Sequence, residues 1–123
     1  MRKHAYRTDD AYLTDIRELC HEILTDVDGL MLPNFLDSDH RLIRKSVTLN
    51  LQLIGEASNR ITEATKLRFP RVPWADMIDL RNRLIHEYFE PNHLLMWNTI
   101  TSMIPQALQG LRPSLKHSHY KKK

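Results

Sequence analysis

The chain of 123 residues has few glycines and one cysteine, and each scarcity excludes a class of structure. Three glycines, with no alternating runs of β-branched and aromatic residues, argue against a β-sheet protein. Cys20 has no second cysteine with which to form an internal disulfide or a cysteine-based zinc site. We therefore expect one helical domain, in which Cys20 is a small apolar residue on a helix.

Long apolar runs are also missing. No stretch approaches the roughly 18 residues that a membrane-spanning helix needs. The first ten residues, MRKHAYRTDD, are charged and contain no apolar segment of the kind found in secretory signals. We expect a cytoplasmic protein without membrane association.

The net charge of +3 is unevenly distributed. Residues 1–7 carry three basic and no acidic side chains, and residues 112–123 carry five basic and no acidic ones. The intervening residues 8–111 hold 10 basic and 15 acidic side chains, a net charge of −5. We divide the chain into a helical domain at 8–112 and a basic, flexible tail at 113–123. From charge alone, the tail either binds nucleic-acid phosphates or only improves solubility.

Apolar residues at helical spacing predict four helices, over 8–27, from about 38 to 61, from Trp74 to about Tyr88, and from about Asn92 to Leu111. Residues 28–37 form a connection, and residues 62–70 either prolong the second helix or form a short one. Pro105 should kink or interrupt the last helix, because proline lacks the N–H that a helix interior requires. Four or five helices with short links predict an all-α antiparallel bundle.

The segment 74–89 combines apolar and chemically reactive side chains. On a helical wheel, Arg81 lies in the middle of an apolar face formed by Trp74, Met77, Ile78, Leu84 and Ile85. A cation there needs a partner, because a buried unpaired charge costs several kcal/mol. Two interpretations stay open. Arg81 either pairs with a carboxylate, from Glu56 or Asp79, or offers its guanidinium to a phosphate in a groove.

Residues 81–88, RNRLIHEY, fit an R-N-x-x-x-H pattern and its longer form R-x4-H-x-Y. Upstream lie the segments Leu53–Ala57 (LIGEA) and Phe69–Trp74 (FPRVPW). Together these motifs resemble the HEPN-domain family, and in particular its HepT-like members, over about residues 10–111. One departure is Asp79-Leu80, where family members often have Gly-Met before the arginine.

The resemblance implies a HEPN-like bundle that forms a homodimer. It also implies a metal-independent endoribonuclease site without a cofactor. The site would lie in the cleft where the two motif helices, the helices that carry Arg81 and His86 in each chain, face each other. The substrate would be an RNA such as tRNA or mRNA. The resemblance further implies a toxin of a toxin–antitoxin system, neutralised by a minimal nucleotidyltransferase that transfers AMP to the motif tyrosine, Tyr88.

Each motif residue has an expected role in RNA cleavage. His86 suits general base or acid chemistry, and Arg81 suits stabilisation of the phosphate and its transition state. Asn82 would orient His86 or hold a phosphate oxygen, and Arg83 would contact the RNA backbone or be a solvated surface residue. Glu56 is expected to be a structural partner of Arg81. His117 and His119, in the tail, are not expected to bind metal.

Arg81 and His86 lie about 140° apart on one helix, so a single chain cannot easily aim both at one phosphorus. A dimer cleft that takes one group from each chain would remove this difficulty. Two other functions remain as alternatives. One is a non-catalytic module that binds a nucleotidyltransferase, and the other is a helical dimerisation protein whose Arg81 is salt-bridged inward. The intact R-x4-H-x-Y motif favours the ribonuclease.

Overall fold

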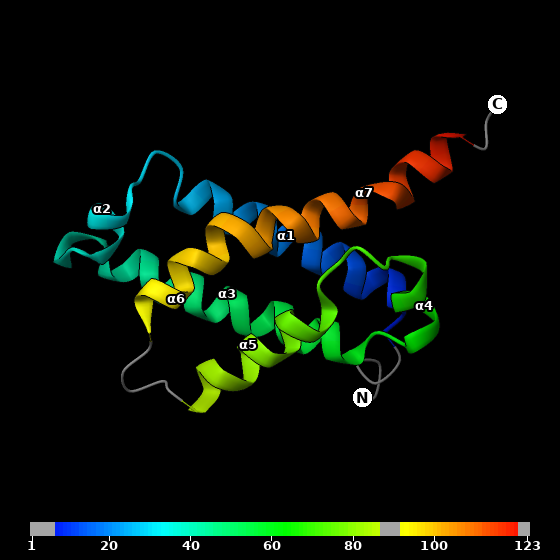
Figure 1. Ribbon diagram of the computed structural model, residues 1–123, viewed down its shortest axis with the longest axis horizontal. Helices are drawn as coiled ribbons and strands as arrows, with labels where there is room; N and C mark the ends of the chain where they lie inside the picture. Colours follow the sequence, from blue (N-terminus) through cyan, green and yellow to red (C-terminus); the bar gives the residue numbers. More distant parts are fainter. Residues whose placement is uncertain (1–6, 87–91, 121–123) are drawn as a thin grey trace.

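The computed structural model describes residues 7–86 and 92–120, with side chains at 7–85 and 92–112. Within these residues the chain is helical, with no β-strand, and the predicted all-α bundle is confirmed (Figure 1). The elements are α1 (Asp9–Asp26), α2 (Leu32–Leu36), the 3₁₀ turn η2 (Ser38–His40), α3 (Arg41–Arg60), α4 (Glu63–Arg68), α5 (Trp74–His86), α6 (His93–Asn98), the π-helical turn η3 (Thr99–Met103) and α7 (Ile104–Tyr120). No described helix is long and apolar enough to cross a membrane.

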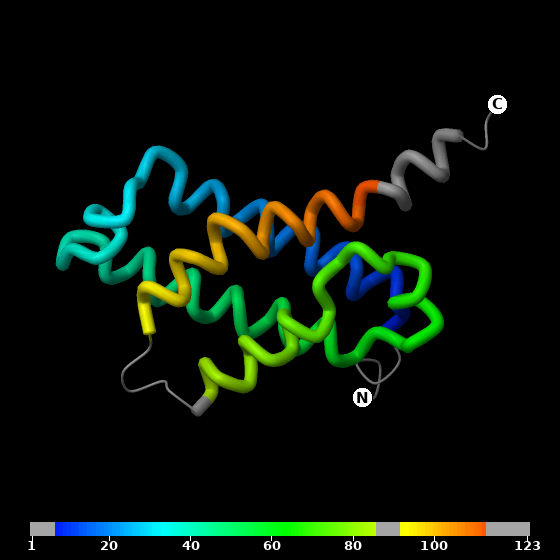
Figure 2. Tube along the Cα trace, in the orientation of Figure 1, coloured from blue at the N-terminus to red at the C-terminus, as the bar shows by residue number. Residues whose placement is uncertain are grey.

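Helix α3 is the centre of the arrangement, with α1 packed on one side and α5 on another. Helices α3 and α5 run in opposite directions, while α6, η3 and α7 form one continuous rod that also contacts α1 (Figures 1 and 2). The short helices lie at opposite ends of the bundle, with α2 beside the start of α3 and α4 beside the start of α1 (Figure 1). The bundle thus leaves a long face of α3 outside the core.

The core fills the space between these helices with aliphatic side chains. Among its fully buried members are Ile16, Ile23, Leu51, Ile54, Ile100 and Ile104. Cys20 belongs to this core, as expected, and burial raises the pKa of its thiol to about 12. The thiol is therefore protonated and unreactive at neutral pH.

Polar contacts fix where α1 begins. The hydroxyl of Thr8 accepts a hydrogen bond from the backbone N–H of Ala11, which caps the helix. The carboxylate of Asp9 accepts hydrogen bonds of 2.6 Å from the hydroxyls of Thr62 and Thr65. These bonds lower the pKa of Asp9 and join the start of α1 to the start of α4.

The connection predicted at 28–37 contains a short helix that the periodicity did not reveal. Helix α2 has Pro33 in its first turn, a position that tolerates proline. Its Phe35 is fully buried and packs against Trp97 with the two rings tilted, their centroids 5.1 Å apart. One aromatic anchor therefore ties this helix to α6. Residues 62–70 were expected either to prolong the second helix or to form a short helix of their own. The structure has the second arrangement, in which α4 is separate from α3.

The predicted interruption at Pro105 is present as the π-helical turn η3, which ends two residues before it. Proline has no N–H to donate within the rod, and a wide turn accommodates that missing bond. The helix that follows, α7, continues to Tyr120 rather than ending at the predicted Leu111. Helix α5 reaches His86, and its predicted extension to Tyr88 lies outside the described residues.

Candidate active site

Helices α3 and α5 meet most closely at Gly55. A Cβ atom at this position would overlap the Cβ of Arg81 and lie 2.9 Å from the backbone oxygen of Met77. Real Cβ atoms do not approach other atoms this closely. Glycine therefore lets the motif helix lie against α3 at the level of Arg81.

The buried face of α5 is formed by Met77, Leu80 and Leu84. Its centre lies about 70° around the helix from Arg81, at 100° per residue. The prediction that Arg81 occupies the middle of the apolar face is therefore wrong. Ile85, on the predicted face, is 44% exposed, which shows that part of this face points away from the core.

The guanidinium of Arg81 is held at two of its nitrogens. Its Nη2 lies 2.9 Å from Oε1 of Glu56, and its Nη1 donates a 2.9 Å hydrogen bond to the side-chain oxygen of Asn82. The Arg81 side chain is nevertheless 28% exposed. A carboxylate from α3 thus fixes the guanidinium in place, and its exposed edge stays accessible to an anion.

Glu56 contacts a second arginine. Its Oε2 accepts a 2.7 Å hydrogen bond from Nε of Arg60, one turn further along α3. This hydrogen bond, followed by the charge of Arg81, lowers the pKa of Glu56 below its ordinary value. One carboxylate therefore pairs with two guanidinium groups, so the cluster of Arg60, Glu56 and Arg81 has a net positive charge.

The structure separates Arg83 from this cluster. Arg83 lines a groove between α5 and the α6–η3 rod, together with Asp76 and Asp79. Asn82 accepts a hydrogen bond from Arg81, and its expected role towards His86 or a phosphate oxygen stays a prediction. The backbone of His86 ends α5, its side chain is not described, and Tyr88 lies outside the described residues.

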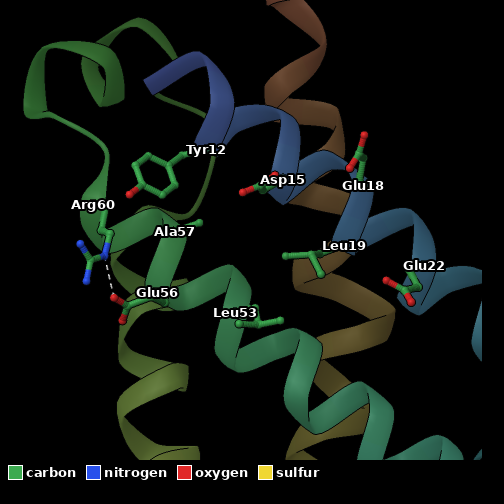
Figure 3. A pocket seen from close by; sticks show the side chains of 9 residues that line it. All are labelled: Tyr12, Asp15, Glu18, Leu19, Glu22, Leu53, Glu56, Ala57 and Arg60. Carbon is green, nitrogen blue, oxygen red and sulfur yellow. Dashed lines mark hydrogen bonds and ion pairs between the residues drawn. The ribbon is translucent and has the colours of Figure 1, made fainter. Parts of the chain in front are cut away.

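A groove of about 360 Å³ runs between α1 and α3 on the other side of Glu56 (Figure 3). Its lining includes Asp15, Glu18 and Glu22 from α1, and Glu56 and Arg60 from α3. Sequence analysis did not single out this groove, although the acids of α1 recur at three- and four-residue spacing. The carboxylates would repel a phosphate backbone, so an RNA that reaches Arg81 should approach from the α5 side.

The match to known proteins agrees with these motifs. The family model described as "Ribonuclease HepT-like" matches residues 10–113. The chain belongs to the HepT-like ribonuclease family. A proposed RNase of Methanocaldococcus jannaschii is 34% identical over 96 residues, covering 78% of this chain and 86% of that one.

Two further relatives extend the comparison. A HepT ribonuclease proposed in Thermococcus cleftensis is 33% identical over 104 residues, or 85% of this chain and 92% of its own. A proposed RNase of Caldanaerobacter subterraneus is 29% identical over 110 residues, or 89% and 96% of the two chains. No solved structure matches the chain. The family model thus reaches from α1 into α7 and includes the segment that carries Arg81 and His86.

Proposed function

We propose that this protein is an endoribonuclease that cleaves RNA without a metal ion, with Arg81 and His86 as its catalytic residues. The observation that carries the proposal is the Arg81 guanidinium, held by Glu56 and Asn82 yet partly exposed on the motif helix of a HepT-like chain. Relatives named as RNases support RNA as the substrate.

The two groups supply complementary chemistry. Metal-independent RNA cleavage requires a base for the 2′-hydroxyl, an acid for the leaving oxygen, and a cation for the charge that develops on the phosphate. An imidazole titrates near neutral pH, which suits His86 to the proton transfers. Arg81, oriented before the substrate arrives, would stabilise the transition state at little reorganisation cost, an effect typically worth a few kcal/mol.

The proposed site is completed by a second copy of the chain. Leu42, Leu49 and Leu53 lie along one face of α3, and they are 71%, 54% and 43% exposed. Glu56 continues the same face and holds Arg81. Burying this stripe against its own copy would bring the two motif helices together, so that each site takes Arg81 from one chain and His86 from the other.

We also propose a toxin role, with activity controlled by an antitoxin of the nucleotidyltransferase class. That enzyme would transfer AMP from ATP to the hydroxyl of Tyr88, two residues beyond His86, and release pyrophosphate. The added phosphate would place negative charge beside the site and repel RNA. If the protein is incubated with the nucleotidyltransferase and ATP labelled at the α-phosphate, the native chain should carry the label and Tyr88→Phe should not. Equal labelling of this variant would place the acceptor elsewhere.

The proposed activity is tested by incubating total RNA, including tRNA, with the native protein in the presence of EDTA. We expect cleavage by the native chain and by Arg83→Ala, which lies in a different groove, and none by His86→Ala. If no RNA is cleaved, the ribonuclease proposal fails. The protein would then be better described as a non-catalytic HEPN module that binds a nucleotidyltransferase.

A further inference from the structure

A second groove of about 360 Å³ lies between the first half of α3 and the start of α6. Its lining residues are Arg41, Arg44, Lys45, Thr48, Leu49, Gln52 and His93. Leu49 also belongs to the leucine stripe proposed above as the contact between copies, so the groove lies along one edge of that contact. Three of these are permanent cations, and none of the described residues that line the groove is acidic. This groove is basic, whereas the groove between α1 and α3 is lined by several carboxylates, and residues 8–111 as a whole carry a net charge of −5.

The cations of this groove differ in whether they make hydrogen bonds within the chain. Arg44 donates hydrogen bonds of 2.6 and 2.7 Å to the backbone oxygens of Phe35 and Asp37, so it has a structural part in holding α2. Arg41 and Lys45 are exposed, and within the described residues their side chains make no ion pair or hydrogen bond. These two cations are therefore free to bind an anion.

The groove continues the surface on which α5 packs. Arg41, Lys45, Thr48 and Gln52 recur every three or four residues, so they form one stripe on α3. The stripe leads directly to Gly55 and Glu56, which contact Arg81. Since α5 runs antiparallel to α3, the end of α5 lies nearer the groove than its start does (Figure 1).

We propose that this basic groove binds the phosphate backbone of the RNA substrate on one side of the cleaved bond. From Arg41 to Gln52 the stripe extends about 16 Å along α3, at 1.5 Å per residue. That length accommodates more than one phosphate of a single strand. Arg41 and Lys45 would hold the backbone, while the side-chain amide of Gln52 offers a hydrogen bond nearer the motif helix. This inference rests on the proposed ribonuclease function.

The test compares two double variants that each remove two positive charges. Arg41→Gln with Lys45→Gln alters the groove, and Arg68→Gln with Arg71→Gln is the matched control at the opposite end of the bundle. Binding is measured with a short fluorescent single-stranded RNA that carries 2′-O-methyl groups, so it cannot be cleaved. Cleavage of the unmodified RNA, thermal unfolding and sedimentation are measured on the same samples.

The logarithm of the binding constant falls as the salt concentration rises, and the steepness of this fall is the salt slope. Each phosphate contact to a single strand adds about 0.7 to that slope per tenfold rise in salt. The groove variant should therefore show a salt slope smaller by about 1.4 and, at about 0.1 M salt, binding weaker by roughly 25-fold. Its KM should rise while its kcat stays near the native value. The control variant should keep most of the native slope, and both should unfold near the native temperature.

The outcomes distinguish the two proposals. If the native protein cleaves RNA but the groove variant keeps the native salt slope and KM, the groove does not bind RNA, and the ribonuclease proposal stands. If the groove variant instead changes the oligomeric state, the groove belongs to the contact between copies and the inference is wrong. If the native protein neither binds nor cleaves RNA, both proposals fail.

Discussion

Replacing Gly55 by alanine should separate the motif helix from α3. The added Cβ would overlap the Cβ of Arg81 and lie 2.9 Å from both the Arg81 Cγ and the backbone oxygen of Met77. A change of rotamer cannot move the Met77 backbone oxygen or the Arg81 Cβ, because the position of each is fixed by the backbone of α5. The two helices must therefore shift apart, and the shift falls directly on the side chain that Glu56 holds.

The expected loss of stability is the difference between two effects. Overpacking a tight contact costs about 1–3 kcal/mol. Alanine in place of glycine in a helix interior returns up to about 1 kcal/mol. Because backbone atoms are involved here, we expect the upper end of the cost and a net destabilisation of about 2 kcal/mol. For a domain of this size, that corresponds to a melting temperature lower by about 8 °C.

The assay pairs thermal unfolding with RNA cleavage at a temperature where the variants remain folded. Gly29→Ala is the matched control, because Gly29 has φ +82° and nothing lies within 4 Å of its added Cβ. This control should lose about 1–2 kcal/mol through backbone strain and keep the native cleavage rate. Gly55→Ala should lose cleavage at least tenfold. A Gly55→Ala protein with native stability would refute the close contact, and one that is destabilised but fully active would show that the contact does not position Arg81.

Three further substitutions test other contacts. Glu56→Gln should lower the free energy of unfolding at pH 7 by less than about 1 kcal/mol, since the pair is partly exposed. Because the folded-state pKa of Glu56 is lowered, its contribution is present above the ordinary value of 4.5 and is lost as the pH falls through the lowered pKa. Urea unfolding should therefore find the two proteins converging in acid, and a pH-independent difference would speak against the ion pairs. Asp9→Asn should cost about 1 kcal/mol by weakening the bonds from Thr62 and Thr65, whereas its exposed neighbour variant Asp10→Asn should cost little; equal melting temperatures for the two would argue against that link. Asn50→Leu should raise the melting temperature, because the side-chain nitrogen of Asn50 is buried and has no hydrogen-bond partner among the described residues. A large loss of stability on that change would mean that the nitrogen has a partner after all.

The long helices could be predicted because their sequence signals are local. Apolar residues repeat over four or five turns in α1 and α3, and Pro105 marks the break in the last rod by its missing N–H. Helix α2 could not be predicted in this way. Its five residues are too few to show a period, and it is held in place by the distant contact of Phe35 with Trp97.

The site could be predicted as a list of residues but not as a geometry. The wheel placed Arg81 at the centre of the apolar face because Ile78 and Ile85 counted equally with the true core residues. A sequence cannot distinguish an apolar residue that faces the core from one that faces a partner chain. Likewise, both Glu56 and Asp79 were possible partners of Arg81, and only the packing of α5 on α3 brings Glu56 to 2.9 Å.

The grooves show the same limit. Arg41 and Lys45 are far in the sequence from His93, and the groove that they line exists only because α6 returns to the start of α3. No spacing within one helix could have indicated it. Local patterns therefore predict which side chains share a helix face, while long-range packing decides which faces form a site.

We propose above that each active site combines Arg81 from one chain with His86 from another. The most direct measurement mixes Arg81→Ala and His86→Ala proteins, allows their subunits to exchange, and follows RNA cleavage in the presence of EDTA. Each variant alone should be inactive. Random exchange makes half of the dimers mixed, each with one intact site of two, so the mixture should recover about a quarter of the native rate. A mixture that forms mixed dimers yet stays as inactive as its two parents would contradict the shared site.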